Sequence, residues 1–217
     1  MNRALIGIAA AVFLGHVGLM TPRGGAQDVA QAKTGSIKGK VTVTGVRNAE
    51  NVLVYLEKAA GEYPPPKEPA EMDQQKLTFV PHVLPILKGT TVRFINSDSI
   101  LHNVFWNKSE NGSYPARNLG TWGKDGKKEF TFDKEGSVVL LCNVHSEMEG
   151  HIVVLQNPFF ALVGADGAYE VKEVPPGQYT VKAWYPNPKK LKPQSTMGTV
   201  TADQVTQLDF SLSGKKK

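Results

Sequence analysis

Four side chains that could bind a soft metal ion stand out in this sequence. Cys142, His145 and Met148 follow one another at intervals of three residues, and His102 lies upstream after a strand-like run. A thiolate, two imidazoles and a thioether form the ligand set of mononuclear copper sites that exchange single electrons. We therefore predict one type 1 copper site, cycling between Cu+ and Cu2+, with these four residues as its ligands.

Cys142 is the only cysteine among the 217 residues. In an exported protein a single thiol is buried and inert, joined to another chain, or bound to a metal. Taken alone, Cys142 reads most simply as a buried structural thiol, and one Cys-x-x-His pair is a weak signal. The register of Met148 and the sequence His102-Asn103-Val104 favour a metal site. Zinc is the main competitor, but a thioether is a poor zinc ligand.

Strands are expected on both sides of the cysteine loop. The runs 137–142 and 151–156 are apolar and β-branched, and pairing between them would hold the ends of a short loop together. His145 and Met148 would then reach the same metal ion as Cys142. His102 opens another strand-like run, 102–106, and we expect it to lie at the same end of the sandwich.

Composition favours an all-β globular protein. The chain is 41% apolar and 21% charged, with 21 glycines and 14 prolines, and its apolar runs are short. No convincing helix or tandem repeat is found. The net charge of +5 is too mild to indicate a nucleic-acid partner.

Residues 1–26 read as a signal peptide. Arg3 precedes an apolar run, Ala4–Leu14, and the small residues Gly24-Gly25-Ala26 come before Gln27, which is a plausible cleavage point. The alternative is an uncleaved anchor, but the apolar run is short for a membrane span and is interrupted by glycines. We expect a periplasmic or secreted protein without stable membrane insertion after cleavage.

The remaining strands are predicted from alternation and turn signals. The run 107–126 is expected to be mostly loop, and 128–133 and 137–142 a hairpin around Glu135-Gly136. The other predicted strands are 36–44, 51–57, 76–80, 82–87, 90–96, 159–163, 168–174, 178–185, 198–201 and 205–212.

Residues 75–156 resemble the cupredoxins, in particular plastocyanin-like, amicyanin-like and methylamine-utilisation-related proteins. The resemblance implies a Greek-key β-sandwich of about eight strands, with copper ligands His102, Cys142, His145 and Met148. It also implies that Asn103 and Asn143 support the ligands, Asn103 by a hydrogen bond across to the cysteine loop. The motifs that carry it are Phe79-Val80-Pro81, Gly89-Thr90-Thr91-Val92, Asn96-Ser97-Asp98, His102-Asn103-Val104, Cys142-x-x-His145-x-x-Met148 and Gly150-His151-Ile152-Val153-Val154.

Two features depart from that pattern. Ser146 and Glu147 stand where amicyanin-like loops carry proline and a bulky apolar residue, so the docking patch around His145 could depend on charge instead. His82 and His151 lie near the ligand-bearing segments and could bind metal in a variant site. We favour a structural role for both, because lone strand histidines seldom bind metal.

The flanking segments resemble a carboxypeptidase regulatory-like, transthyretin-type β-sandwich. The motifs are Gly35-Ser36-Ile37-Lys38-Gly39-Lys40-Val41, Asp166-Gly167-Ala168-Tyr169, and Val174-Pro175-Pro176-Gly177-Gln178-Tyr179. We predict a discontinuous domain, 36–58 and 157–213, separated from the cupredoxin domain 75–156 by a proline-rich linker over 59–74. The alternative assigns the strands of 36–57 to the copper domain.

Three classes of function remain open. The first is an electron carrier that serves a protein redox partner, such as a cytochrome or a periplasmic dehydrogenase. The second is a copper enzyme, which we disfavour because further copper centres need many histidines and no His-x-His pair follows residue 26. The third is a periplasmic copper carrier or a structural surface protein, although a carrier should display methionine and histidine clusters.

Overall fold

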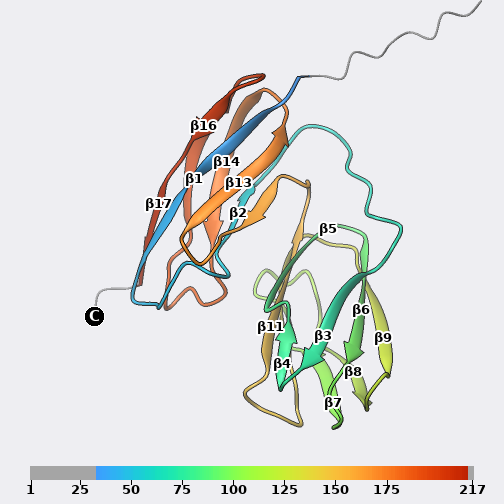
Figure 1. Cartoon of the computed structure of the whole chain (residues 1–217). Helices are drawn as coiled ribbons and strands as arrows, with labels where there is room; N and C mark the ends of the chain where they lie inside the picture. The colour runs from blue at the N-terminus through green and yellow to red at the C-terminus, as the bar shows by residue number, and fades with distance from the viewer. Residues whose placement is uncertain (1–32, 215–217) are drawn as a thin grey trace, which may run out of the picture. The chain divides into compact units, whose positions relative to one another are not determined.

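The computed structural model describes residues 33–214, which form 17 strands and no α-helix. The predicted signal peptide, 1–26, lies outside the described residues. Within them, no helix is long and apolar enough to cross a membrane. The strands belong to four sheets, which make up two sandwiches (Figure 1).

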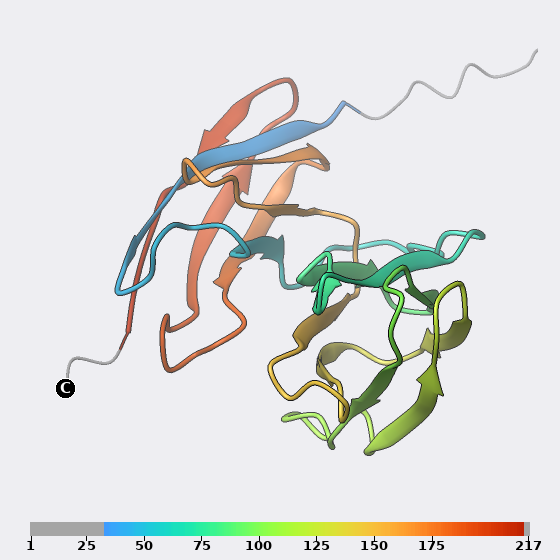
Figure 2. The same ribbon diagram turned by 60° about the horizontal axis from the view of Figure 1, so that its bottom comes forward.

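Strands β3 to β11 form what we call the inserted sandwich. One sheet has five strands in the order β5-β11-β10-β7-β8, and the other has four in the order β4-β3-β6-β9. In Figures 1 and 2 these strands are coloured from teal through green to yellow. Their bounds are β3 Ala70–Gln75, β4 Thr78–Val80, β5 Val83–Leu87, β6 Thr90–Asn96, β7 His102–Trp106, β8 Arg117–Trp122, β9 Lys127–Phe132, β10 Gly136–Leu141 and β11 Glu149–Leu155.

The other strands form the flanking sandwich. One sheet joins β13, β1 and β16, with β17 also paired to β1, and the other has the order β12-β2-β14-β15. In both views β1 is blue, β2 is cyan to teal, and β12 to β17 run from orange to red. Their bounds are β1 Gly35–Thr44, β2 Leu53–Leu56, β12 Phe160–Leu162, β13 Ala168–Val174, β14 Gly177–Trp184, β15 Gln194–Val200, β16 Val205–Gln207 and β17 Phe210–Ser213.

Within residues 33–214, the first two strands pair only with strands from the later part of the chain. β1 pairs with β13, β16 and β17, and β2 pairs with β12 and β14. The segment carrying β3 to β11 therefore stands, in sequence, between β2 and β12. The expected linker is shorter than 59–74, because Ala70–Gln75 forms β3 and runs parallel to β6.

One local expectation was wrong. β9 and β10 do not form a hairpin: β9 pairs with β6 in one sheet, and β10 pairs with β7 and β11 in the other. Gly136, with a φ of 139°, stands where the chain crosses between the sheets, a backbone angle that glycine tolerates best. The run 107–126 is mostly loop, as expected, but Arg117–Trp122 within it forms β8 beside β7, a strand that the sequence did not predict.

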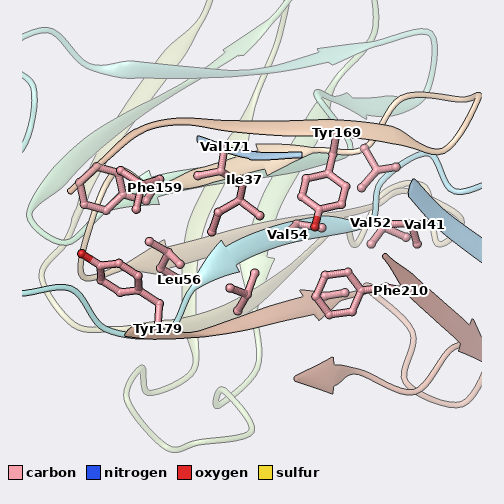
Figure 3. Packing of buried hydrophobic residues seen from close by; sticks show 14 of the residues in the cluster. Ile37, Val41, Val52, Val54, Leu56, Phe159, Tyr169, Val171, Tyr179 and Phe210 are labelled. Carbon is pink, nitrogen blue, oxygen red and sulfur yellow. The ribbon is translucent and has the colours of Figure 1, made fainter. Parts of the chain in front are cut away.

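Alternation of side chains builds both cores. In β6, Thr90, Val92, Phe94 and Asn96 point inward while the residues between them are half-buried, as expected for a strand with period two. In the flanking sandwich, Figure 3 shows the side chains of Ile37, Val54, Leu56, Tyr169 and Val171 gathered in one core. Each sandwich thus has its own apolar cluster.

An aromatic group ties the two sheets of the inserted sandwich together. Trp106 of β7 meets Phe130 of β9 at a centroid distance of 5.1 Å, and Phe130 meets Phe132 at 4.9 Å. Tyr114 packs edge-on against Phe132 at 5.4 Å. Such pairs contribute about 0.5–1.5 kcal/mol each beyond the area they bury. They fix the end of β7 opposite to His102, and so help to orient the strand that His102 begins.

Gly150 offers a test of this packing. A Cβ atom there would lie 2.6 Å from the Cβ of Phe79, too close for either backbone to remain in place. We expect Gly150→Ala to lower the free energy of unfolding by about 1–3 kcal/mol, measured by urea denaturation of the metal-free protein.

Gly123→Ala is the matched control, since its Cβ would meet only Leu101 at an ordinary 3.5 Å. It should change stability by no more than about 0.5 kcal/mol. Equal effects of the two substitutions would contradict the packing described for Gly150.

Candidate metal centre

The cysteine loop is closed by a strand pair. β10 lies between β7 and β11, and its last residue, Leu141, pairs with the first residue of β11, Glu149. The loop 142–148 therefore leaves and re-enters the same sheet at adjacent positions. On the other side of β10, Leu141 pairs with Phe105 of β7. The strand that begins at His102 is thus the direct neighbour of the strand that ends just before Cys142.

Three of the predicted ligands converge. Each of His102, Cys142 and His145 offers one donor atom, and these atoms all lie within 4.8 Å of one another. The Nδ1 atoms of the two histidines are 3.1 Å apart. The exposed fraction of His102 is 0% and that of Cys142 is 4%, whereas His145 is only half-buried. Two donors are sealed inside the sandwich and the third reaches toward its surface.

The sulfur of Cys142 accepts a hydrogen bond from the backbone N–H of Asn103, at 3.4 Å. The side chain of Asn103 does something else: its Nδ2 donates to Asn118 Oδ1 at 2.8 Å and to the carbonyl of Gly120 at 2.7 Å, both in β8. The bond to the cysteine thus comes from the backbone, while the amide ties β7 to β8. Asn143, the other predicted supporting residue, is exposed.

Met148 is buried at the end of the same loop. Its exposed fraction is 1%, and it belongs to the apolar cluster that contains Cys142. Its backbone N–H donates to the carbonyl of His145 at 3.1 Å, which turns the chain back toward β11. This turn brings Met148 into the same buried cluster as Cys142, and its role as a ligand remains a prediction.

Asn96 organises the loop that leads to His102. It is 1% exposed, and its Nδ2 donates to the carbonyls of Ile100 and Trp122 at 2.9 and 3.0 Å. Its Oδ1 accepts the backbone N–H of Asp98 at 2.9 Å. One amide side chain therefore forms hydrogen bonds with three backbone groups of the neighbouring segments. A buried amide needs such hydrogen-bond partners, and Asn96 finds all of them in the backbone.

Asp98 contacts the buried histidine, and the sequence reasoning did not single it out as a site residue. Its Oδ2 lies 2.9 Å from His102 Nε2. Hydrogen bonds from the backbone N–H of Leu77, then of Lys76, and from His102 hold the pKa of Asp98 below its usual range. The sequence held one signal that could have identified Asp98 as a site residue: it is a carboxylate four residues before a predicted metal-binding histidine, and metal-binding histidines often contact carboxylates.

His82 and His151 do not join the donor cluster. His151 is 2% exposed, its Nε2 lies 3.0 Å from Glu149 Oε1, and its ring packs against that of His82 at a centroid distance of 5.3 Å. Burial lowers the pKa of His151 below its ordinary value. These contacts accord with the structural role that we favoured for both histidines.

A comparison with protein families matches residues 67–155 to the copper binding proteins of the plastocyanin/azurin family. This segment contains every strand of the inserted sandwich and all four predicted ligands. It has the cupredoxin fold. The matched residues do not include the flanking sandwich, so its likeness to a carboxypeptidase regulatory-like domain remains a prediction.

Solved structures with a detectable likeness include several of amicyanin. The reduced Cu(I) form of one amicyanin mutant at pH 4 is 25% identical, over 41% of this chain and 84% of that chain, with a TM-score of 0.37. The oxidised state of another mutant is 27% identical, over 40% and 81%, also with a TM-score of 0.37. No curated protein matches the chain.

The donor set of the cupredoxin domain suits copper. A thiolate sulfur and two imidazole Nδ1 atoms meet without a carboxylate among the donors, and copper tolerates this mixture of soft and intermediate ligands. Together with the family match, the cluster identifies a single copper site. His102, Cys142 and His145 would hold the ion, which exchanges one electron when bound.

The Asn96 hydrogen bonds yield a second prediction. Asn96→Ala leaves buried backbone groups without partners, so we expect it to lower the free energy of unfolding by about 2–3 kcal/mol. Because the segment leading to His102 loses its anchor, copper affinity should fall as well. Urea denaturation of the metal-free protein and competition with a copper chelator measure the two effects.

Ser97→Ala, in the same segment, removes only an exposed hydrogen bond from Ser97 Oγ to Asp73. It should leave both stability and affinity nearly unchanged. If Asn96→Ala behaved like this control, Asn96 would not be the residue that anchors the segment.

Proposed function

We propose that this protein is an exported type 1 copper protein that carries single electrons between redox partners. Copper is held by His102, Cys142 and His145, with Met148 as the weak axial ligand. The observation that carries the proposal is the convergence of one thiol and two imidazoles within 4.8 Å inside a plastocyanin/azurin-type domain. A fixed set of donors suited to both oxidation states needs little rearrangement when an electron moves.

His145 is the proposed point of electron entry and exit. It is half-buried, unlike the sealed His102, so its ring edge offers the shortest way from the donor cluster to solvent. Apolar residues next to the ligands in sequence are exposed: Ile100 at 44%, Leu101 at 58% and Val144 at 47%. A protein partner could therefore dock against apolar side chains here, besides the charges of Glu147 and Glu149 that are also exposed.

The burial of the donors favours an electron carrier over a copper carrier. Cys142 and Met148 are at most 4% exposed, and His102 is fully buried. A carrier that hands its metal to another protein needs accessible donors, whereas an electron carrier needs a slow-exchanging ion. Copper in this protein should therefore exchange slowly while its oxidation state changes readily.

The remaining parts of the proposal concern the whole chain. We propose that the protein has no catalytic activity of its own, because one site saturated with protein ligands leaves no position for a substrate. The flanking sandwich, as a carboxypeptidase regulatory-like domain, would serve to stabilise the cupredoxin domain or to dock it. The signal-like residues 1–26 support a periplasmic or secreted location.

The first test is the spectrum of the protein loaded with Cu2+. We expect an intense visible absorption from the thiolate–copper bond and the narrow copper hyperfine splitting of a type 1 site in the EPR spectrum. Cys142→Ser should abolish the colour while leaving the metal-free fold intact by circular dichroism. A blue Cys142→Ser protein, or a colourless wild type that binds Cu2+ tightly, would refute the proposed ligand set.

The axial role of Met148 has a separate test. Met148→Leu should keep the blue colour, because the thiolate and both imidazoles remain, but should raise the reduction potential as the weak fourth ligand is lost. Met72→Leu is the control, since Met72 is equally buried in the same cluster. A potential that moves equally in both variants would indicate an effect of core packing, not of ligation.

A further inference from the structure

Asp98 stands behind His102, on the side of its ring away from the donor cluster. The Nδ1 of His102 is the atom that lies 3.1 Å from His145 Nδ1, while its Nε2 lies 2.9 Å from Asp98 Oδ2. His102 itself is fully buried. One nitrogen of the His102 ring, Nε2, thus contacts a carboxylate, and the other, Nδ1, faces the proposed metal position.

The carboxylate of Asp98 is held in place without the histidine. Its Oδ1 accepts the backbone N–H of Lys76 at 2.8 Å, and its Oδ2 accepts that of Leu77 at 3.1 Å. Lys76 and Leu77 form the turn between β3 and β4 and have φ angles of 53° and 59°, which point both N–H groups to one side. The side chain is 17% exposed, so its charge is only partly screened by solvent.

We propose that Asp98 is a positioning residue that fixes the Nδ1 of His102 as the copper-binding atom and lowers the reduction potential of the site. This inference rests on the proposed copper function and extends it. A carboxylate that accepts the Nε2 proton leaves Nδ1 unprotonated and makes the imidazole a stronger donor. A nearby negative charge also favours the more highly charged Cu2+ over Cu+, which lowers the potential.

The two histidines are therefore unequal. Among the described residues, the only hydrogen-bond partner of the His145 ring is His102 itself, whereas His102 is anchored by a fixed carboxylate. On this account the buried His102 sets the reduction potential of the site, and the half-exposed His145 is the route for electron transfer. The turn between β3 and β4, far from the ligands in sequence, takes part in the site through Asp98.

A purely structural role for Asp98 is the competing account, because it also caps that turn. Asp73 provides the matched control: its carboxylate accepts hydrogen bonds from the N–H and Oγ of Ser97 at 3.2 and 2.8 Å. It thus ties the same segment to β3. In the part of the chain that the structure describes, Asp73 has no hydrogen bond or ion pair with a histidine. Asp73→Asn therefore removes a comparable charge and leaves the contact between Asp98 and His102 intact.

The first measurement is the reduction potential of the copper-loaded full chain. Asp98→Asn should weaken the preference for Cu2+ over Cu+ about tenfold, which raises the potential by about 59 mV for one electron. Asp98→Glu keeps a carboxylate and should restore much of the wild-type value, and Asp73→Asn should not differ from wild type. Equal potentials in Asp98→Asn and wild type, or equal shifts in the two asparagine variants, would overturn the proposal.

The second measurement uses the metal-free protein and does not depend on copper. Nitrogen-15 NMR of the wild type should show His102 with its proton on Nε2. In Asp98→Asn an amide offers one acceptor oxygen to three N–H donors, so the proton should move partly or wholly to Nδ1. An Nδ1 proton in the wild type overturns the proposal even if no variant folds. A correct tautomer in a wild type that never turns blue would instead refute only the copper function.

Discussion

The position of β10 between β7 and β11 is the constraint on which the copper site depends. Pairing of Leu141 with Glu149 closes the loop 142–148, and pairing of Leu141 with Phe105 sets β7 alongside. These two pairings place the loop that carries Cys142, His145 and Met148 beside β7, the strand that His102 begins. A slip of one residue in either register would turn every side chain of β10 to the opposite face.

The copper site has a side that is held rigidly by hydrogen bonds and a side that is accessible to solvent. On the rigid side, backbone and side-chain hydrogen bonds hold Asn96, Asp98 and Asn103, and through them His102 and the sulfur of Cys142. On the accessible side, His145 stands half-exposed on a short loop, between the exposed residues Val144 and Ser146. Sealed donors limit exchange of the ion and changes of geometry, while the exposed ring keeps the site within reach of a partner.

The sequence predicts those parts of the fold that follow local alternation. Thr90–Asn96 and Ala168–Val174 have the expected bounds because apolar and polar residues largely alternate there. His102–Trp106 also has the expected bounds, although its residues are mostly buried and do not alternate. β3 is missed because its inward residues include an amide, Gln74, and its outward ones are polar. β8 is missed because only Trp122 of its residues is buried and a glycine interrupts it. The hairpin at Glu135-Gly136 is wrong because pairing partners are set by the whole sandwich, not by the turn.

The same limit applies to the site. The spacing of Cys142, His145 and Met148 is visible in the sequence because one loop carries all three. The contact between Asp98 and His102 depends on the turn at Lys76 and Leu77, which comes from a strand that the sequence does not reveal. Residues that support a ligand from another element become identifiable only once the sheet order is known.

X-ray absorption spectroscopy of the copper-loaded chain, in both oxidation states, tests the central claim most directly. The account predicts one short copper–sulfur bond and two imidazole nitrogens, with nearly the same distances in Cu+ and Cu2+. A copper ion surrounded only by nitrogen and oxygen, or one whose ligand distances change widely on reduction, would contradict it.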